Sequence, residues 1–251
     1  MYLIEELDDV PVVKVSNLLP EWFIDELYGL LGELEGQFAT PNWSSGKDRP
    51  MVNKRTSMSL CSAKDMWFPA TIANKNSPGG QPWVPALMYE MLERFIFHQG
   101  ILDFLSHSSE DVFRLIPEQS HDGRMHIVSY GDKDYYNWHR DHTMPDGAFM
   151  YGKSPARKVL FTFNLCLCKN DDMIGGDGLY MKDNKTVVAP FEHNSMYIFP
   201  ATVSHAASAI KMNSKDTWLN RRFSCQFWMA GTQVITPAER ENGRWTGPTS
   251  K

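Results

Sequence analysis

The hydrophobic pattern divides the chain into two unlike parts, and the first part predicts helices. In residues 18–34 the apolar side chains recur at the spacing of a helix, and Pro20 stands near its start. The positions on this apolar stripe are Trp22, Phe23, Leu27, Leu30, Leu31 and Leu34. A second helical pattern covers residues 84–99 and continues into 101–107. Residues 36–57, between the two patterns, are rich in Gly, Pro, Ser and Asn, which is typical of a loop.

The second part, from about Gly123 onward, has the pattern of short strands divided by Gly, Asn, Asp and Pro. The predicted strands cover residues 124–130, 135–141, 157–167, 178–181, 185–190, 195–199, 204–210 and 221–230. Short strands with this punctuation predict a sandwich or a barrel. We expect the helices of the first part to cover one outer face of that barrel.

The length of 251 residues suits one domain with a single core. The sequence shows no internal repeat and no low-complexity linker. We therefore expect a single domain over residues 1–251, made of a helical and loop support, a β core and a tail. The support covers residues 1–120, the β core residues 121–231 and the tail residues 232–251.

The last predicted strand has two chemically different faces. By strand alternation, Phe223, Cys225 and Phe227 share an apolar face, which we expect to pack against the helices. The opposite face carries Arg222, Ser224, Gln226 and Trp228, which suit a polar pocket. A buried arginine needs an anionic partner. Either the distal carboxylate of a bound dicarboxylate or a structural aspartate could supply one.

Residues 130–142, YGDKDYYNWHRDH, concentrate aromatic, histidine and aspartate side chains. His139 and Asp141 are two apart, so on a strand both side chains lie on one face. Taken alone, this pair also fits a surface strand with polar residues pointing outward. His205, which follows the apolar strand at 195–199, adds a second histidine. Two histidines and one carboxylate are the ligand set of non-haem Fe(II) oxygenases.

Charge, hydropathy and cysteine content indicate which partners and which cellular compartment to expect. The formal net charge of -5 gives no basic footprint for a phosphate backbone, so we expect no nucleic-acid partner. The longest apolar run is too short to span a bilayer, and the first residues lack the pattern of a signal peptide. The four cysteines have no zinc-type spacing and are interpreted as buried free thiols in a reducing compartment. We therefore expect a cytoplasmic protein without a membrane partner.

The second part resembles the Fe(II)- and 2-oxoglutarate-dependent dioxygenases, in the branch related to prolyl 4-hydroxylases. The resemblance extends from about residue 123 to residue 231. It depends on the order and spacing of the segments YGDKDYYNWHRD, RKVLFTFNL, GGDGLYM, FPATVSH and RFSCQFW. It implies a mainly β fold with N-terminal helices (α+β), in which a double-stranded β-helix, or jelly roll, forms a cupin-like barrel.

The resemblance also implies roles for particular residues. His139, Asp141 and His205 are the implied catalytic Fe(II) ligands, and Arg222 is the implied anchor of the distal carboxylate of 2-oxoglutarate. Relatives often carry a tyrosine where this chain has Asn164, so we expect Asn164 to contact the co-substrate in its place. The remaining candidate contacts to 2-oxoglutarate are Thr162, Ser224 and Tyr130, and Tyr130 can equally be a barrel aromatic.

The implied activity is hydroxylation of a C–H bond with O₂, accompanied by release of succinate and CO₂, and ascorbate is a candidate aid. A prolyl residue in a peptide or protein is the first substrate prediction. A free amino acid or small metabolite is the second, and demethylation of nucleic acid is the third. A non-catalytic binding module that keeps the barrel and a cupin-like enzyme with another metal are the alternatives of a different class. The sequence leaves the oligomeric state open.

Overall fold

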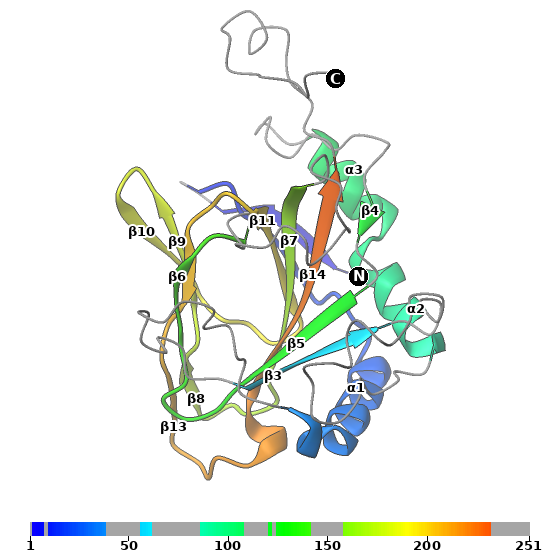
Figure 1. The fold of residues 1–251 in the computed structure, drawn as a ribbon, viewed down its shortest axis with the longest axis vertical. Coiled ribbons are helices and arrows are strands. Elements are labelled where there is room, and N and C mark those ends of the chain that lie inside the picture. The colour runs from blue at the N-terminus through cyan, green and yellow to red at the C-terminus, as the bar shows by residue number, and fades with distance from the viewer. Residues whose placement is uncertain are drawn as a thin grey trace, which may run out of the picture.

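The computed structural model arranges most of the described strands in two antiparallel sheets that face each other (Figure 1). It describes residues 2–7, 10–38, 56–61, 86–107, 120–121, 124–141 and 158–231. In the larger sheet the strands follow in the order β1 (Leu3–Glu6), β2 (Val13–Ser16), β11 (Ser195–Pro200), β7 (Lys158–Leu167), β14 (Arg222–Gly231), β5 (Arg124–Tyr130) and β3 (Thr56–Cys61). A short strand, β4 (Ser120–His121), pairs with the end of β14.

The smaller sheet closes the other side of the barrel. Its strands follow in the order β10 (Lys185–Ala189), β9 (Gly178–Lys182), β12 (His205–Ala207) and β6 (Tyr136–His139). A separate pair joins β8 (Met173–Gly175) to β13 (Ile210–Met212). The two sheets form the double-stranded β-helix that the resemblance implied, and the predicted fold class is confirmed.

Three helices lie on the outer face of the larger sheet (Figure 1). They are α1 (Glu21–Glu33), α2 (Ala86–Ile96) and α3 (Gln99–His107), and 3₁₀ turns cover Glu35–Gln37 and Trp218–Asn220. Their apolar residues share one buried cluster with Phe163, Phe223 and Phe227 of the sheet. Phe97, directly after α2, lies with its ring centroid 5.0 Å from that of Phe163 and 6.0 Å from that of Phe227.

Strand β11 shows how the two layers determine burial. All of its residues are buried, because the helices lie on one side of it and the barrel interior on the other. On the interior side Tyr197 and Phe199 pack with Cys166 and Tyr180. The barrel interior is therefore lined by side chains of both sheets, and a site there draws on strands that are distant in sequence.

The predicted helices and the eight predicted strands all appear, with differences in detail. The run 204–210 forms two separate strands, β12 and β13, and β8 adds a strand that was not predicted. Trp22, predicted on the buried stripe of α1, is 55% exposed. The helix buries the arc that faces the sheet, and Ile24 and Tyr28 lie on that arc instead.

The helical and loop description of residues 1–120 is incomplete, because this region also contributes strands. Strands β1 and β2 extend the larger sheet beyond β11, and β3 extends it beyond β5. Strand β3 begins at Thr56, inside the stretch that was expected to be a loop. The expected tail, residues 232–251, lies outside the described residues. Within the described ranges, none of the helices is both long and apolar enough to cross a bilayer.

Candidate functional site

Two histidines and one aspartate meet at the end of the smaller sheet. His139 ends β6 and His205 begins β12, and the antiparallel pairing of these strands sets the two residues directly opposite each other. Asp141 follows β6 by two residues. Its Oδ1 lies 3.4 Å from His139 Nε2 and 3.8 Å from His205 Nε2. One ligand atom from each of the three residues lies within 4.8 Å of the others.

Both histidines are oriented by backbone carbonyl groups. His139 Nδ1 lies 2.8 Å from the carbonyl oxygen of Asn137, and His205 Nδ1 lies 3.0 Å from that of Val203. A carbonyl oxygen only accepts, so each Nδ1 donates to it, and in a neutral ring the Nε2 then presents its lone pair to the cluster. Burial lowers the pKa of His205 despite the charge of Asp141, which favours the neutral ring that a metal ligand requires.

The Asp141 carboxylate is buried and held through its second oxygen. Oδ2 accepts a hydrogen bond from the Thr162 hydroxyl and another from Trp228 Nε1, the latter at 3.3 Å. Burial by itself would raise the pKa of Asp141, but the neighbouring His205 and His139 and the Thr162 hydroxyl hold it below its usual range. The group therefore remains a carboxylate at neutral pH.

Arg222 is buried on the interior face of β14, with 3% of its surface exposed. Its guanidinium group lies over the rings of Tyr130 and Phe191, 4.7 Å and 5.0 Å from their centroids. Nη2 contacts the Cys166 Sγ at 3.9 Å. Within the described part of the chain, Nε and Nη1 are buried without a hydrogen-bond partner. A buried cation left in this state indicates that a bound anion completes the site.

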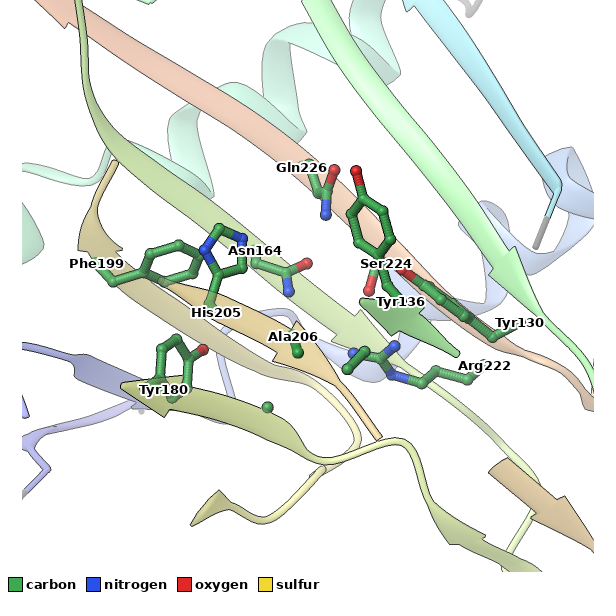
Figure 2. Close-up of a pocket in the computed structure, with 12 residues that line it drawn as sticks. Tyr130, Tyr136, Asn164, Tyr180, Phe199, His205, Ala206, Arg222, Ser224 and Gln226 are labelled. Atoms are coloured by element: carbon green, nitrogen blue, oxygen red, sulfur yellow. The ribbon is translucent and has the colours of Figure 1, made fainter. Parts of the chain in front are cut away.

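One pocket connects the histidine cluster to Arg222 (Figure 2). It encloses about 340 Å³, part of it open to solvent. Its lining comes from both sheets and consists of Tyr130, Tyr136, Asn164, Gly178, Tyr180, Phe199, His205, Ala206, Ala207, Arg222, Ser224 and Gln226. Figure 2 shows Arg222 extending its guanidinium group toward the middle of the pocket, where the Asn164 amide also points.

The residues expected to contact 2-oxoglutarate divide into two groups. Tyr130, Asn164 and Ser224 line the pocket with Arg222. Thr162 does not appear among the described pocket-lining residues, and its hydroxyl donates to Asp141 instead. Their binding roles stay predictions. The alternation of β14 is observed as expected, because Phe223, Cys225 and Phe227 pack against the helices while Arg222 faces the pocket.

Several residues of the site were not singled out in the sequence. The Tyr136 ring lies 4.0 Å from that of His139, and the Phe199 ring 4.5 Å from that of His205. Tyr180, opposite His205 in the β12–β9 pair, adds a further buried aromatic wall. Strand parity in β9 and β11 could have placed Tyr180 and Phe199 on the interior face. Their closeness to His205 depends on strand pairing, which the sequence does not give.

The second of the two adjacent glycines of the resemblance lies against Arg222. Gly175 and Gly176 have φ angles of 80° and 75°, in the left-handed region that favours glycine. A Cβ atom at Gly176 would lie 3.1 Å from Arg222 Cδ and 3.2 Å from Ile210 Cγ1. The glycine therefore leaves the space in which the arginine side chain extends.

Three of the four cysteines, Cys166, Cys168 and Cys225, are buried free thiols, as expected. The side chain of Cys61 lies outside the described residues. Burial raises the pKa of the Cys225 thiol to about 12, so it stays protonated.

Comparison with known proteins agrees with this geometry. The sequence model described as the 2OG-Fe(II) oxygenase superfamily matches residues 125–230, which include the histidine cluster and Arg222. The search of curated proteins gave no significant match.

The fold is similar to that of several solved structures. OsALKBH1 is 18% identical, with a TM-score of 0.57 over 90% of this chain and 99% of that one. The viral collagen prolyl hydroxylase of Paramecium bursaria Chlorella virus-1 is 13% identical, with a TM-score of 0.53 over 90% of this chain and 98% of that one. A prolyl hydroxylase from Trichoplax adhaerens, solved with a hypoxia inducible factor peptide fragment, is 12% identical, with a TM-score of 0.55 over 89% and 87%.

The jelly-roll barrel, its largely buried His–Asp–His cluster and the superfamily match agree with a non-haem iron oxygenase core. The superfamily match over residues 125–230, together with the cluster, supports an Fe(II)- and 2-oxoglutarate-dependent dioxygenase, and the neighbouring folds are similar to this chain in their barrel. The match and the His–Asp–His cluster indicate Fe(II) as the cofactor and 2-oxoglutarate and O₂ as the co-substrates.

Proposed function

We propose that the protein hydroxylates a prolyl residue in a peptide or protein. The observation that carries the catalytic part of this proposal is one pocket that joins His205 of the metal cluster to Arg222, whose Nε and Nη1 lack a hydrogen-bond partner among the described residues. The prolyl part is supported by two neighbouring folds that are prolyl hydroxylases, one of them solved with a peptide. The net charge of -5 favours such a substrate over a nucleic acid.

His139, Asp141 and His205 would hold the iron. Two neutral imidazole nitrogens and one carboxylate oxygen are the donor set that non-haem Fe(II) sites use. Both Nε2 atoms and Asp141 Oδ1 converge on one point, and the backbone anchors of the two rings keep them there. The residues present therefore fit Fe(II) without rearrangement of the strands.

Arg222 would bind the distal carboxylate of 2-oxoglutarate. Nε and Nη1 have no hydrogen-bond partner among the described residues, and a guanidinium group can donate two parallel hydrogen bonds to one carboxylate through Nη1 and Nη2 or through Nε and Nη2. Asn164 lies in the same pocket, and its Oδ1 is buried without a hydrogen-bond partner among the described residues. An asparagine offers both a donor and an acceptor, so its amide group can turn its NH₂ toward the ligand. Tyr130 and Phe191 hold the guanidinium between them and fix its direction.

Bound Fe(II) and 2-oxoglutarate supply the oxidising chemistry, in which O₂ puts one oxygen atom into the substrate C–H bond and the other into succinate as CO₂ leaves. The chain itself orients the reactants and keeps the site dry. Tyr136, Tyr180 and Phe199 surround the two histidines with aromatic surface. Burial of Asp141 and His205 leaves little water to compete for the metal cluster.

The experiment is a substrate panel read out by succinate formation with Fe(II), 2-oxoglutarate and O₂. The panel contains proline-containing peptides, the same peptides with alanine in place of proline, free proline and single-stranded oligonucleotides. We expect succinate formation to rise with a proline peptide and not with its alanine counterpart, and mass spectrometry to find 16 Da added to that peptide. Stimulation by free proline or by an oligonucleotide alone would replace the prolyl-peptide proposal with the corresponding substrate class.

A further inference from the structure

The two oxygens of the Asp141 carboxylate have different surroundings. Oδ1 faces the histidines, at 3.4 Å from His139 Nε2 and 3.8 Å from His205 Nε2. Oδ2 faces away from them and accepts from the Thr162 hydroxyl and from Trp228 Nε1. The indole N–H can only donate, and a hydroxyl beside a carboxylate also donates. Both donors are therefore committed to one oxygen.

The two donors are a matched pair from the opposite sheet. In the β14–β7 pairing, Trp228 lies directly opposite Thr162. Strand alternation turns both side chains into the barrel, where they are 8% and 1% exposed. Asp141 itself stands just after β6 of the smaller sheet. The contacts thus bridge the two sheets at the metal cluster, and they reach only the oxygen that points away from it.

We propose that Thr162 and Trp228 are positioning residues that hold Asp141 to one-oxygen coordination of the iron, through Oδ1. This inference rests on the proposed role of Asp141 as an iron ligand. A carboxylate oxygen that already accepts two hydrogen bonds from buried donors is a poor second ligand, because binding the metal would break both bonds and leave the donors unsatisfied.

One-oxygen coordination matters because of the positions it leaves open. Iron held by His139, His205 and one oxygen of Asp141 would keep positions free for 2-oxoglutarate and for O₂. If Asp141 also bound through Oδ2, one of those positions would be lost. We therefore expect loss of the two donors to lower kcat more than it raises the KM for 2-oxoglutarate.

A purely structural role is the alternative, since a buried indole N–H needs a partner in any fold. The two roles are separated by variants that keep shape and remove only the donor. Thr162→Val replaces the hydroxyl by a methyl group, and Thr162→Ser keeps the hydroxyl. Trp228→Phe removes the N–H but keeps an aromatic ring beside His126. In the wild-type protein the His126 and Trp228 ring centroids are 5.8 Å apart. Ser129→Ala is the matched control, because Ser129 is a fully buried hydroxyl on β5 whose strand position faces the helices rather than the pocket.

The first measurement is the affinity of the full-length metal-free protein for Mn(II), which is obtained by titration. We expect Thr162→Val and Trp228→Phe each to weaken Mn(II) binding by about 10- to 100-fold, the range typical of residues that orient a metal ligand. Thr162→Ser and Ser129→Ala should bind within about threefold of wild type. The second measurement is the visible absorption of the Co(II)-loaded protein, which responds to the atoms bound to the metal. We expect Thr162→Val and Trp228→Phe to shift this spectrum, and Thr162→Ser to restore it.

Steady-state kinetics supplies the third measurement, with kcat reduced in Thr162→Val and a KM for 2-oxoglutarate close to that of wild type. The inference would be overturned if Thr162→Val and Trp228→Phe both kept the wild-type Mn(II) affinity and Co(II) spectrum. This holds even if the melting temperatures of the two variants fall. If the wild-type protein and Ser129→Ala bind no Mn(II), or if Asp141→Ala binds it as tightly as wild type, the proposed metal site itself fails. The two failures are therefore distinguishable.

Discussion

His205 lies directly opposite His139 in the β12–β6 pair, and the centroids of their imidazole rings are 4.1 Å apart. Two imidazolium ions this close would repel each other, and burial lowers the pKa of His205, which favours its neutral form. The pairing of two short strands thus creates a preformed nitrogen pair. A divalent metal ion can accept the lone pairs of both rings at once.

The first prediction concerns this pair. We expect His205→Ala and His139→Ala each to lower succinate formation by about 100-fold or more, because loss of a ligand is at least as severe as loss of a residue that orients one. The measurement is 2-oxoglutarate turnover at saturating Fe(II). His193→Ala is the control, since His193 accepts a hydrogen bond from the Cys168 backbone N–H and is not part of the cluster. Turnover near the wild-type rate in either ligand variant would contradict the proposed roles.

The second prediction concerns the co-substrate anchor. Arg222→Lys keeps the charge but loses the fork of donors that matches a carboxylate. A hydrogen bond to a charged group contributes about 1.5–3 kcal/mol, so we expect the KM for 2-oxoglutarate to rise by roughly 10- to 100-fold. The matched control is Arg221→Lys, one position away on the opposite face of the chain, where Arg221 pairs with Asp216 at 2.7 Å. Its KM should stay within about twofold of wild type. Equal effects of the two variants would argue against Arg222 as the anchor.

The long periodic segments were predictable because their pattern is local. The strand over β14 alternates apolar and polar side chains along its length, and the structure buries the two sets on opposite faces. Strands β1 and β2 were missed because each has only four residues. Backbone pairing with β11, far away in the sequence, holds them in the sheet. Their strand character is a tertiary effect that no local pattern carries.

In the candidate site, too, local features were predictable and features that depend on strand pairing were not. The spacing of His139 and Asp141 is local and predicts one shared face. The hydrogen bond from Trp228 to Asp141 depends on the register of β14 against β7 and on the path of the chain after β6. Neither can be read from the sequence. Thr162 was expected near the co-substrate because it shares a strand face with Asn164, and only the register shows that its hydroxyl reaches Asp141.

The third prediction tests the space beside Arg222. Gly176→Ala forces a residue with a Cβ into a φ of 75° and brings that Cβ to 3.1 Å from Arg222 Cδ. We expect a loss of about 1–2 kcal/mol in the free energy of unfolding, from the backbone conformation alone, and a raised KM for 2-oxoglutarate. Chemical denaturation and initial rates give the two values.

Gly29→Ala is the control for that substitution. Gly29 lies on the exposed side of α1, and no described heavy atom lies within 4 Å of a Cβ built there. Alanine favours the helix, so this variant should gain about 0.5–1 kcal/mol and leave the KM unchanged. If Gly176→Ala behaved like Gly29→Ala, the glycine would have no part in shaping the anchor.

The fourth prediction concerns the helices as a support for the catalytic barrel. Phe227 is fully buried between β14 and the segment after α2, and its ring meets that of Phe97 edge-on. Phe227→Ala should lower the free energy of unfolding by about 3–5 kcal/mol, because it removes a large side chain and leaves a cavity. Trp22→Ala removes a larger side chain that is 55% exposed on α1, and we expect its stability to stay within about 0.5 kcal/mol of wild type. Denaturant unfolding followed by circular dichroism measures both.

Because Phe227 lies on the face of β14 away from the pocket, the folded fraction of Phe227→Ala should keep the wild-type KM for 2-oxoglutarate. A changed KM in that fraction would mean that the helix-facing packing also sets the direction of Arg222.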